Sequence, residues 1–203
     1  MNELDKSQDL DLVFLIDRSG SMFGSEQDTI GGFNSFIETE RKKEFNTNVT
    51  TILFDDKYEV LYERKPINDV ERLTGEQYFV RGTTALLDAI GKTITSLDRK
   101  VNNKVLFVIM TDGLENASVE FSRDQIKNMI SNHDWEFVYI GADIDSYAES
   151  GRIGIAKSRT ANYCKSLRGF DALYSSVSKA ADCMRENKSL DDADWKKELD
   201  EYD

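Results

Sequence analysis

Two short polar stretches of the sequence carry oxygen-bearing side chains directly after apolar runs. Asp17 follows the apolar residues 12–16, and Ser19 and Ser21 come next with a glycine between them. Asp112, followed by a glycine, ends a second apolar run. The glycine of the first stretch lets the chain turn tightly, so that both hydroxyls can point the same way. Carboxylate and hydroxyl oxygens are hard ligands, and they suit magnesium or manganese better than zinc, which prefers nitrogen and sulfur.

The elements around these stretches alternate between strand and helix. The apolar runs within residues 12–16, 104–111 and 135–140 are typical of strands that are buried on both faces. Between and after them, apolar residues recur at helical spacing in four segments, residues 25–37, 86–97, 122–130 and 170–184. Ser25 with Asp28, and Ser122 with Gln125, have the spacing of capping boxes at two of the helix starts.

One segment departs from the alternation. Residues 51–54 and 58–62 flank Asp55-Asp56-Lys57, which indicates a hairpin. Residues 153–156 are expected to add a short strand before the last helix. The chain is therefore predicted to be an α/β, Rossmann-like three-layer sandwich. Its central sheet is mainly parallel with one antiparallel edge strand, and helices cover both faces.

Asp17 and Asp112 would meet at one edge of such a sheet. Ligands of open α/β sheets bind at the carboxyl ends of the strands, where both aspartates fall. Each aspartate alone has a plainer interpretation as a turn former or a helix cap. The combination of two carboxylates with hydroxyls at the same edge is much harder to explain by chance, and it favours a cation site.

These stretches, in their order along the chain, resemble the three motifs of the von Willebrand factor type A (VWA) domain family. Residues 17–22 (Asp-Arg-Ser-Gly-Ser-Met) are similar to the first motif. Residues 82–90 (Gly-Thr-Thr-Ala-Leu-Leu-Asp-Ala-Ile) resemble the second, and residues 111–113 (Thr-Asp-Gly) resemble the third. The resemblance covers residues 10–186 of the chain. It implies a metal-ion-dependent adhesion site, abbreviated MIDAS.

The resemblance also implies which side chains hold the ion. Magnesium or manganese would be bound by two serines, Ser19 and Ser21. A threonine and two aspartates, Thr84, Asp17 and Asp112, would bind the ion directly or through water. The remaining position would be left for an Asp or Glu of a partner protein. Thr83 stays open as an alternative to Thr84. The family's five-residue step from the threonine to a helix alanine, here Ala89, favours Thr84.

Composition narrows the classes of partner and compartment. A net charge of −12 repels nucleic acid, and no apolar run approaches the roughly 20 residues of a membrane span. Cys164 and Cys183 lack metal-binding spacing, and the N-terminus has no apolar signal segment. We expect a cytoplasmic protein of the intracellular bacterial or phage type. By analogy with such members, its partner would be an AAA+ ATPase or a component of a stress or resistance module.

The chain is predicted to contain one VWA domain, residues 1–188, followed by an acidic segment, residues 189–203. In this segment Trp195, Leu199 and Tyr202 share one helical face. The segment is interpreted as a solvated tail or a final helix packed on the domain, with a docking helix for a partner as the alternative.

A binding module is favoured over an enzyme, but two other functions stay open. A magnesium-dependent phosphoryl-transfer enzyme would use Asp17 as nucleophile and Arg18 or Arg81 to hold phosphate, yet Ser19 stands where a second carboxylate is expected. The third possibility is a VWA domain whose metal site is unused. Three residues near the predicted sheet edge are expected at a rim that contacts the partner: Arg81, Asp143 and Asp145.

Overall fold

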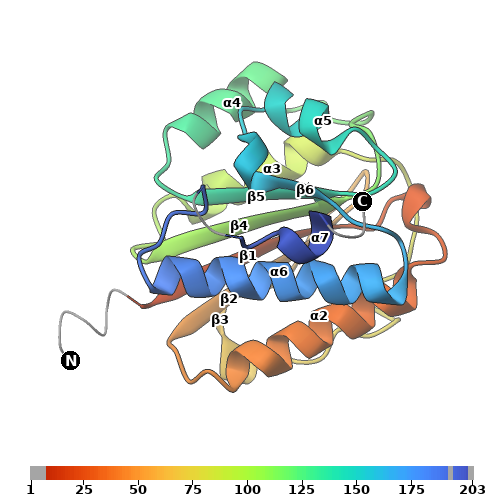
Figure 1. The fold of residues 1–203 in the computed structure, drawn as a ribbon. Coiled ribbons are helices and arrows are strands. Elements are labelled where there is room, and N and C mark those ends of the chain that lie inside the picture. Colours follow the sequence, from red (N-terminus) through yellow and green to blue (C-terminus); the bar gives the residue numbers. More distant parts are fainter. Residues whose placement is uncertain (1–7, 192–193, 201–203) are drawn as a thin grey trace.

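Six strands form one sheet in the computed structural model, which describes residues 8–191 and 194–200 (Figure 1). They are β1 (Leu10–Asp17), β2 (Thr47–Phe54), β3 (Tyr58–Pro66), β4 (Lys104–Thr111), β5 (Glu136–Gly141) and β6 (Thr160–Asn162). Their order is β3-β2-β1-β4-β5-β6, and every neighbouring pair is parallel except β2 and β3. The predicted parallel sheet with one antiparallel edge strand is therefore confirmed.

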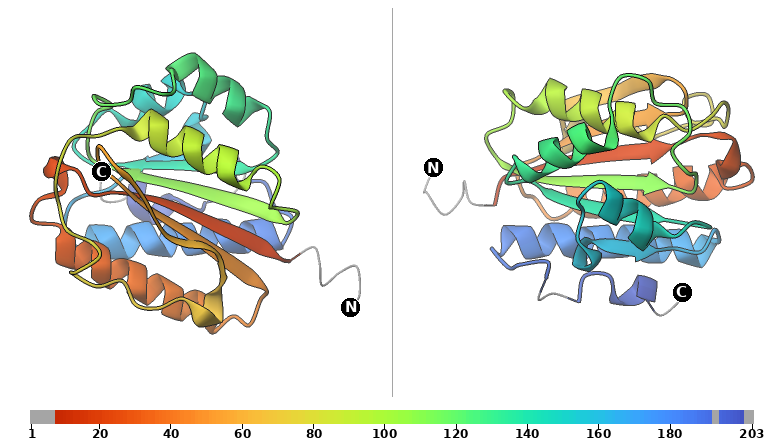
Figure 2. Two further views of the ribbon diagram at one scale, coloured as in Figure 1. Left: turned by 180° about the vertical axis from the view of Figure 1, so that it is seen from behind. Right: turned by 90° about the horizontal axis from the view of Figure 1, so that it is seen from above.

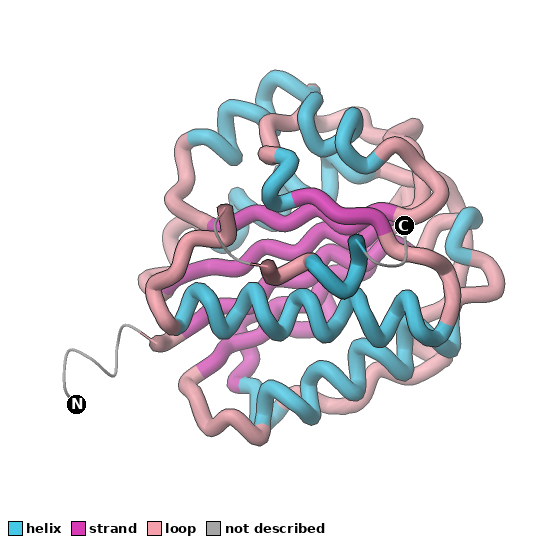
Figure 3. The backbone as a smooth tube through the Cα atoms, viewed as in Figure 1, coloured by secondary structure: helices cyan, strands magenta, loops and turns pink. Residues whose placement is uncertain are grey.

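Helices cover both faces of this sheet and complete three layers (Figures 1 and 3). One face carries α2 (Glu26–Arg41), α6 (Leu167–Arg185) and the short α7 (Lys197–Asp200). The other carries α3 (Leu86–Leu97), α4 (Arg123–Ser131) and α5 (Ser146–Arg152), as the rotated views of Figure 2 also show. Among the helices of the described residues, none combines the length and apolar character needed to cross a membrane.

Strand β1 shows how the sequence produces two cores. All of its side chains are buried, and alternate residues face opposite sides of the sheet. Phe14 and Ile16 pack in the core under α2 and α6, while Val13 and Leu15 pack in the core under α3 and α4. A strand buried on both faces needs an unbroken apolar run, which is the pattern that the sequence displays.

The structure confirms one of the two predicted capping boxes and corrects the other. Ser122 and Gln125 form the reciprocal hydrogen bonds at the start of α4. Ser25 precedes α2, but its backbone has φ −103° and ψ 3°. A capping side chain needs an extended backbone to reach the first turn, so the box predicted for Ser25 and Asp28 does not form.

The strand predicted at residues 153–156 was also placed wrongly. Ile153 follows α5 as its C-cap residue, and Gly154 turns the chain with a φ of +88°. Ile153 and Ile155 are buried as loop residues in the core under α3 and α4. A 3-10 helix, η3 (Lys157–Arg159), comes next, and the last strand is the three-residue β6.

The described part of the acidic C-terminal segment packs against the domain. Leu190, Trp195 and Leu199 are buried in the core that lies under α6. The Trp195 indole donates a hydrogen bond to the Ser158 carbonyl at 3.0 Å, and the Lys196 ammonium donates to the Thr160 carbonyl of β6 at 2.7 Å. Tyr202, the third residue of the predicted helical face, lies outside the described residues.

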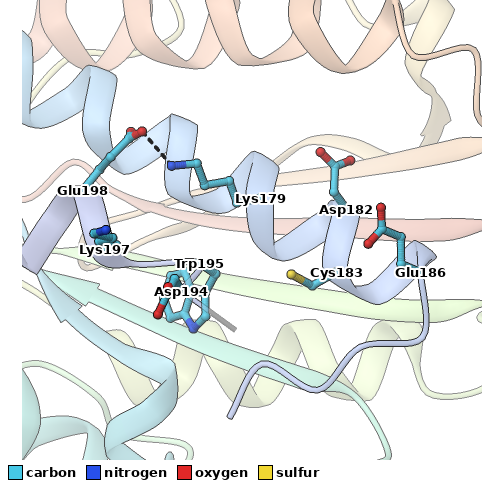
Figure 4. Close-up of a pocket in the computed structure, with 8 residues that line it drawn as sticks. All are labelled: Lys179, Asp182, Cys183, Glu186, Asp194, Trp195, Lys197 and Glu198. Carbon is cyan, nitrogen blue, oxygen red and sulfur yellow. Dashed lines mark hydrogen bonds and ion pairs between the residues drawn. The ribbon is translucent and has the colours of Figure 1, made fainter. Parts of the chain in front are cut away.

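A cavity of about 590 Å³ lies between α6 and this segment (Figure 4). Charged side chains surround it, and an ion pair of 2.6 Å joins Lys179 of α6 to Glu198 of α7. Trp195 contributes to its wall from the C-terminal segment. The residues that line this cavity include neither Asp17 nor Asp112.

The topology brings the two aspartates together. From β1 the chain moves outward to β2 and β3, and it later returns to β4 on the opposite side of β1. The loops after β1 and β4 therefore diverge at the switch point of the sheet, where open α/β folds place their ligands. Asp17 ends β1, and Asp112 follows β4 directly.

Candidate metal centre

The first and third motifs make direct contact at the switch point. The hydroxyl oxygens of Ser19 and Ser21 are 3.1 Å apart. The Ser21 hydroxyl donates to Oδ1 of Asp112 at 2.5 Å, across 91 residues of sequence. Two loops that follow adjacent strands thus bring hydroxyl and carboxylate oxygens into one cluster.

The surroundings of Gly113 show that the second motif joins the same cluster. A Cβ atom at Gly113 would lie 2.6 Å from Oγ1 of Thr84, 3.2 Å from Oγ of Ser21 and 3.4 Å from Oγ of Ser19. The three hydroxyls therefore converge on one point, and only a residue without a side chain fits beside them. Thr84 is buried, whereas Thr83 is exposed. The geometry favours Thr84 as the threonine of the cluster.

Asp17 is buried beneath the hydroxyls and is held by both of its oxygens. Oδ1 accepts the Ser19 backbone N–H at 2.7 Å, and Oδ2 accepts the Thr111 hydroxyl at 2.5 Å. Burial raises the pKa of Asp17 from 3.8 to about 6, although the hydrogen bonds from Thr111 and Ser19 oppose the rise. The ionised carboxylate is thus costly where it stands, and a nearby cation would relieve that cost.

A buried ion cluster fixes the loops of the first two motifs. Asp55, at the turn between β2 and β3, accepts the Arg18 guanidinium at 2.9 Å and the Arg81 guanidinium at 2.7 Å. The two loops also share backbone hydrogen bonds, from Arg81 N to Arg18 O and from Gly20 N to Gly82 O. Gly82 has a φ of +67°, which only glycine adopts without strain. These contacts hold the loops that carry the hydroxyls against each other.

The loop after Asp112 is tied to the start of α3. The side chain of Asn116 accepts the Thr84 backbone N–H at 2.9 Å. The Asp88 carboxylate of α3 accepts three backbone N–H groups of residues 119–121, each at 2.9 Å. These anchoring roles of Asp88 and Asn116 were not predicted from the sequence. The only signal for them was that Asp88 and Asn116 lie within or just after the second and third motifs.

Lys165 adds a cation to the cluster that was not predicted from the sequence. The Lys165 ammonium makes a short ion pair with Oδ2 of Asp112, a second at 2.8 Å with Asp143, and a hydrogen bond at 3.1 Å to the Ser21 carbonyl. Burial lowers the pKa of Lys165, but the hydrogen bonds to Asp112 and Asp143 outweigh it and the pKa is raised. The ammonium therefore stays charged at neutral pH.

The residues predicted at the rim have different surroundings. Asp143 reaches the cluster through Lys165. Asp145 caps α5, because its carboxylate accepts the Ala148 N–H at 3.0 Å. Arg81 is bound to Asp55 and stacks over the exposed ring of Phe79. A contact between any of these three and a partner stays a prediction.

The donors present fit a hard divalent cation. Three hydroxyls and two carboxylates supply only oxygen. The hydroxyls and Asp112 border a cavity of about 400 Å³, and Asp17 is buried behind it. Within residues 8–191 and 194–200, no group of three or more His, Cys, Asp or Glu side chains is placed to hold an ion. Any ion at this edge would thus depend on hydroxyl oxygens, which suits magnesium or manganese.

Comparison with solved structures identifies the same fold. The chain superposes on proximal thread matrix protein 1 of the mussel byssus with a TM-score of 0.65 and 17% identity, covering 85% of this chain and 46% of the mussel protein. It thus spans less than half of that relative. A second structure of the mussel protein, described as having a zinc-occupied MIDAS motif, gives a TM-score of 0.61 and 16% identity over 88% of this chain and 45% of the other.

A manganese-loaded structure of the TRAP protein of Plasmodium vivax gives a TM-score of 0.57 and 19% identity, over 77% of this chain and 68% of the other. No curated protein sequence matches the chain. The model of the von Willebrand factor type A domain family, however, matches residues 11–178. This match contains all three motifs and most of the chain, and the chain therefore belongs to the von Willebrand factor type A domain family.

Proposed function

We propose that this chain is a metal-dependent protein-binding module whose magnesium or manganese ion accepts a carboxylate from a partner. The observation that carries the proposal is the convergence of the Ser19, Ser21 and Thr84 hydroxyls on Gly113, beside Asp112. These four side chains and Asp17 would hold the ion. Two carboxylates and neutral hydroxyls leave a dication able to attract a further anion.

The rim of the cluster offers surface for the rest of an interface. Leu114 borders the cavity and is 54% exposed, and Phe23, two residues after Ser21, is 82% exposed. Exposed apolar side chains beside an anion-accepting ion suit a partner segment that carries an Asp or Glu next to apolar residues. An AAA+ ATPase or a stress-module protein as this partner, and a cytoplasmic location, are parts of the proposal that come from the resemblance alone.

The geometry disfavours phosphoryl transfer. Both oxygens of Asp17 accept hydrogen bonds and the residue is fully buried, so the carboxylate is poorly placed to attack a substrate. Arg18 and Arg81, the two candidate phosphate clamps, are bound to Asp55 instead. A binding role needs none of these groups to be free.

The proposal is tested by metal titration of wild type and of a variant that blocks the cluster without removing an oxygen. In Gly113→Ala, the new methyl group would displace Thr84 Oγ1 and crowd both serines. Calorimetry with Mn²⁺ should show one site in the wild-type protein and an affinity roughly 10–100-fold lower in the variant. Gly75→Ala is the control, because a Cβ at Gly75 meets nothing within 4 Å.

The same pair of variants separates metal binding from partner binding. A protein captured by the wild type in Mn²⁺ should be released by chelator and should fail to bind Gly113→Ala, while Gly75→Ala retains it. Wild-type protein that takes up neither Mn²⁺ nor Mg²⁺ would refute the metal centre. A partner that binds equally well in chelator would move the interface away from this edge.

A further inference from the structure

Lys165 occupies a position that links four segments of the cluster edge. It lies in the loop between β6 and α6. Its ammonium contacts Ser21 of the first motif, Asp112 of the third, and Asp143 of the loop after β5. The side chain is 21% exposed, so these contacts are partly shielded from water. A charge in this position acts on the same carboxylate that a bound ion would use.

The backbone at Asp143 supports a specific contact with Lys165. Asp143 has a φ of +56°. This left-handed region is common for glycine but is seldom adopted by residues that carry a side chain. Asp is among the residues that tolerate this conformation best, yet it still costs free energy. Here the conformation accompanies the 2.8 Å pair with Lys165, and the pair in turn holds the ammonium beside Asp112.

We propose that Lys165 is a built-in cation that neutralises Asp112 in the metal-free protein and competes with the metal ion for it. The inference rests on the proposed metal-binding function and adds an element that sets its affinity. If the ion displaces the ammonium, the ion pairs with Asp112 and Asp143 are lost. If the ammonium stays, it repels the dication at close range. Both routes weaken metal binding, so the sign of the effect is the same.

The ion pair between Lys165 and Asp112 should also stabilise the metal-free protein. Asp112 is buried, and Lys165 supplies its ionic partner. Removal of the ammonium leaves a buried carboxylate uncompensated beside the buried Asp17. The metal-free protein should therefore lose stability from the same substitution that improves its affinity for metal.

Lys165→Met tests the inference, because methionine keeps the apolar stem and removes the charge. Calorimetry should show Mn²⁺ binding about tenfold tighter than in wild type, since two charges on an ion repel one charge appreciably at this range even in a high dielectric. In chelator, the melting temperature of the variant should fall below that of wild type. Lys165→Gln serves as a second variant if the methionine protein folds poorly.

The control is Lys100→Met, which makes the same change in net charge at a distant ion pair with Glu63. It should leave the affinity for Mn²⁺ within about twofold of wild type. Equal affinity in wild type and Lys165→Met, or an equal gain in Lys100→Met, would overturn the inference while leaving the metal centre intact. Failure of both proteins to bind Mn²⁺ would overturn both this inference and the proposed function.

Discussion

Replacing Asp17 by asparagine should stabilise the metal-free protein at pH 8 by up to about 3 kcal/mol and should abolish stabilisation by Mn²⁺. Burial raises the pKa of Asp17 from 3.8 to about 6, so the folded protein is penalised for carrying the ionised form. Asparagine has nearly the same shape and is neutral. Its amide can accept the Ser19 N–H and donate to the Thr111 oxygen, which preserves the contacts of the carboxylate.

The pH dependence of stability follows from the same raised pKa of Asp17. The carboxyl of the unfolded chain ionises near pH 3.8, and that of the folded chain near pH 6. Between these values the folded state binds more protons than the unfolded state, so wild-type stability falls as the pH rises through the window. Below it, wild type and Asp17→Asn should be nearly equal in stability, and above it the difference should be complete.

Urea denaturation in chelator at roughly pH 4, 5, 6 and 8 measures the difference between the two proteins, and other titrating groups cancel in that difference. Repeating the measurement at the highest pH in Mn²⁺ should stabilise wild type alone, by about 2.7 kcal/mol at about 100 times the dissociation constant. A variant less stable than wild type in chelator at that pH would show that the Asp17 carboxylate stabilises the fold instead of straining it.

Trp195→Ala should lower the free energy of unfolding by about 3–5 kcal/mol, the usual cost of truncating a large buried aromatic side chain. The indole is 1% exposed, packs in the core under α6 and donates to the Ser158 carbonyl. The substitution would leave a cavity and an unpaired carbonyl in the same place. The affinity for Mn²⁺ should stay unchanged, because the cavity that Trp195 lines includes none of the residues that converge on Gly113.

Chemical denaturation of Trp195→Ala beside Lys197→Ala checks this prediction. Lys197 is exposed in the same segment, so its truncation should change stability by less than about 0.5 kcal/mol. If Trp195→Ala proved as stable as wild type, the segment would contribute nothing to the fold. Leu190, Trp195 and Leu199 would then be better explained as a surface that binds a partner.

The sequence predicted the site best where the reactive side chains directly follow strands of the parallel sheet. An unbroken apolar run needs a strand buried on both faces, and a parallel strand places its last residue at the carboxyl edge of the sheet. The meeting of Asp17 and Asp112 at that edge could therefore be predicted from the sequence. The choice of Thr84 over Thr83 followed from its distance to the helix alanine, and the contact with Gly113 agrees with it.

Lys165 escaped prediction for a physical reason. Strand β6 has three residues, too few to show an alternating pattern, and the apolar residues 153–156 resembled a strand more closely. The loop after β6 was therefore not recognised as part of the sheet edge. The role of Trp195 could not be decided from the sequence either. An apolar helical face predicts that Trp195 is buried, but it does not indicate whether the face packs on the domain or on a partner.

The two outer strands of the sheet have a further consequence, for assembly. An exposed edge strand offers unpaired backbone groups to another chain and so invites edge-to-edge pairing. Here β3 bears charged side chains, is irregular in its register with β2 and ends at Pro66. At the opposite edge, the Lys196 ammonium already occupies the Thr160 carbonyl of β6. Both edges are poor templates for sheet extension, which protects the chain from aggregation by that route.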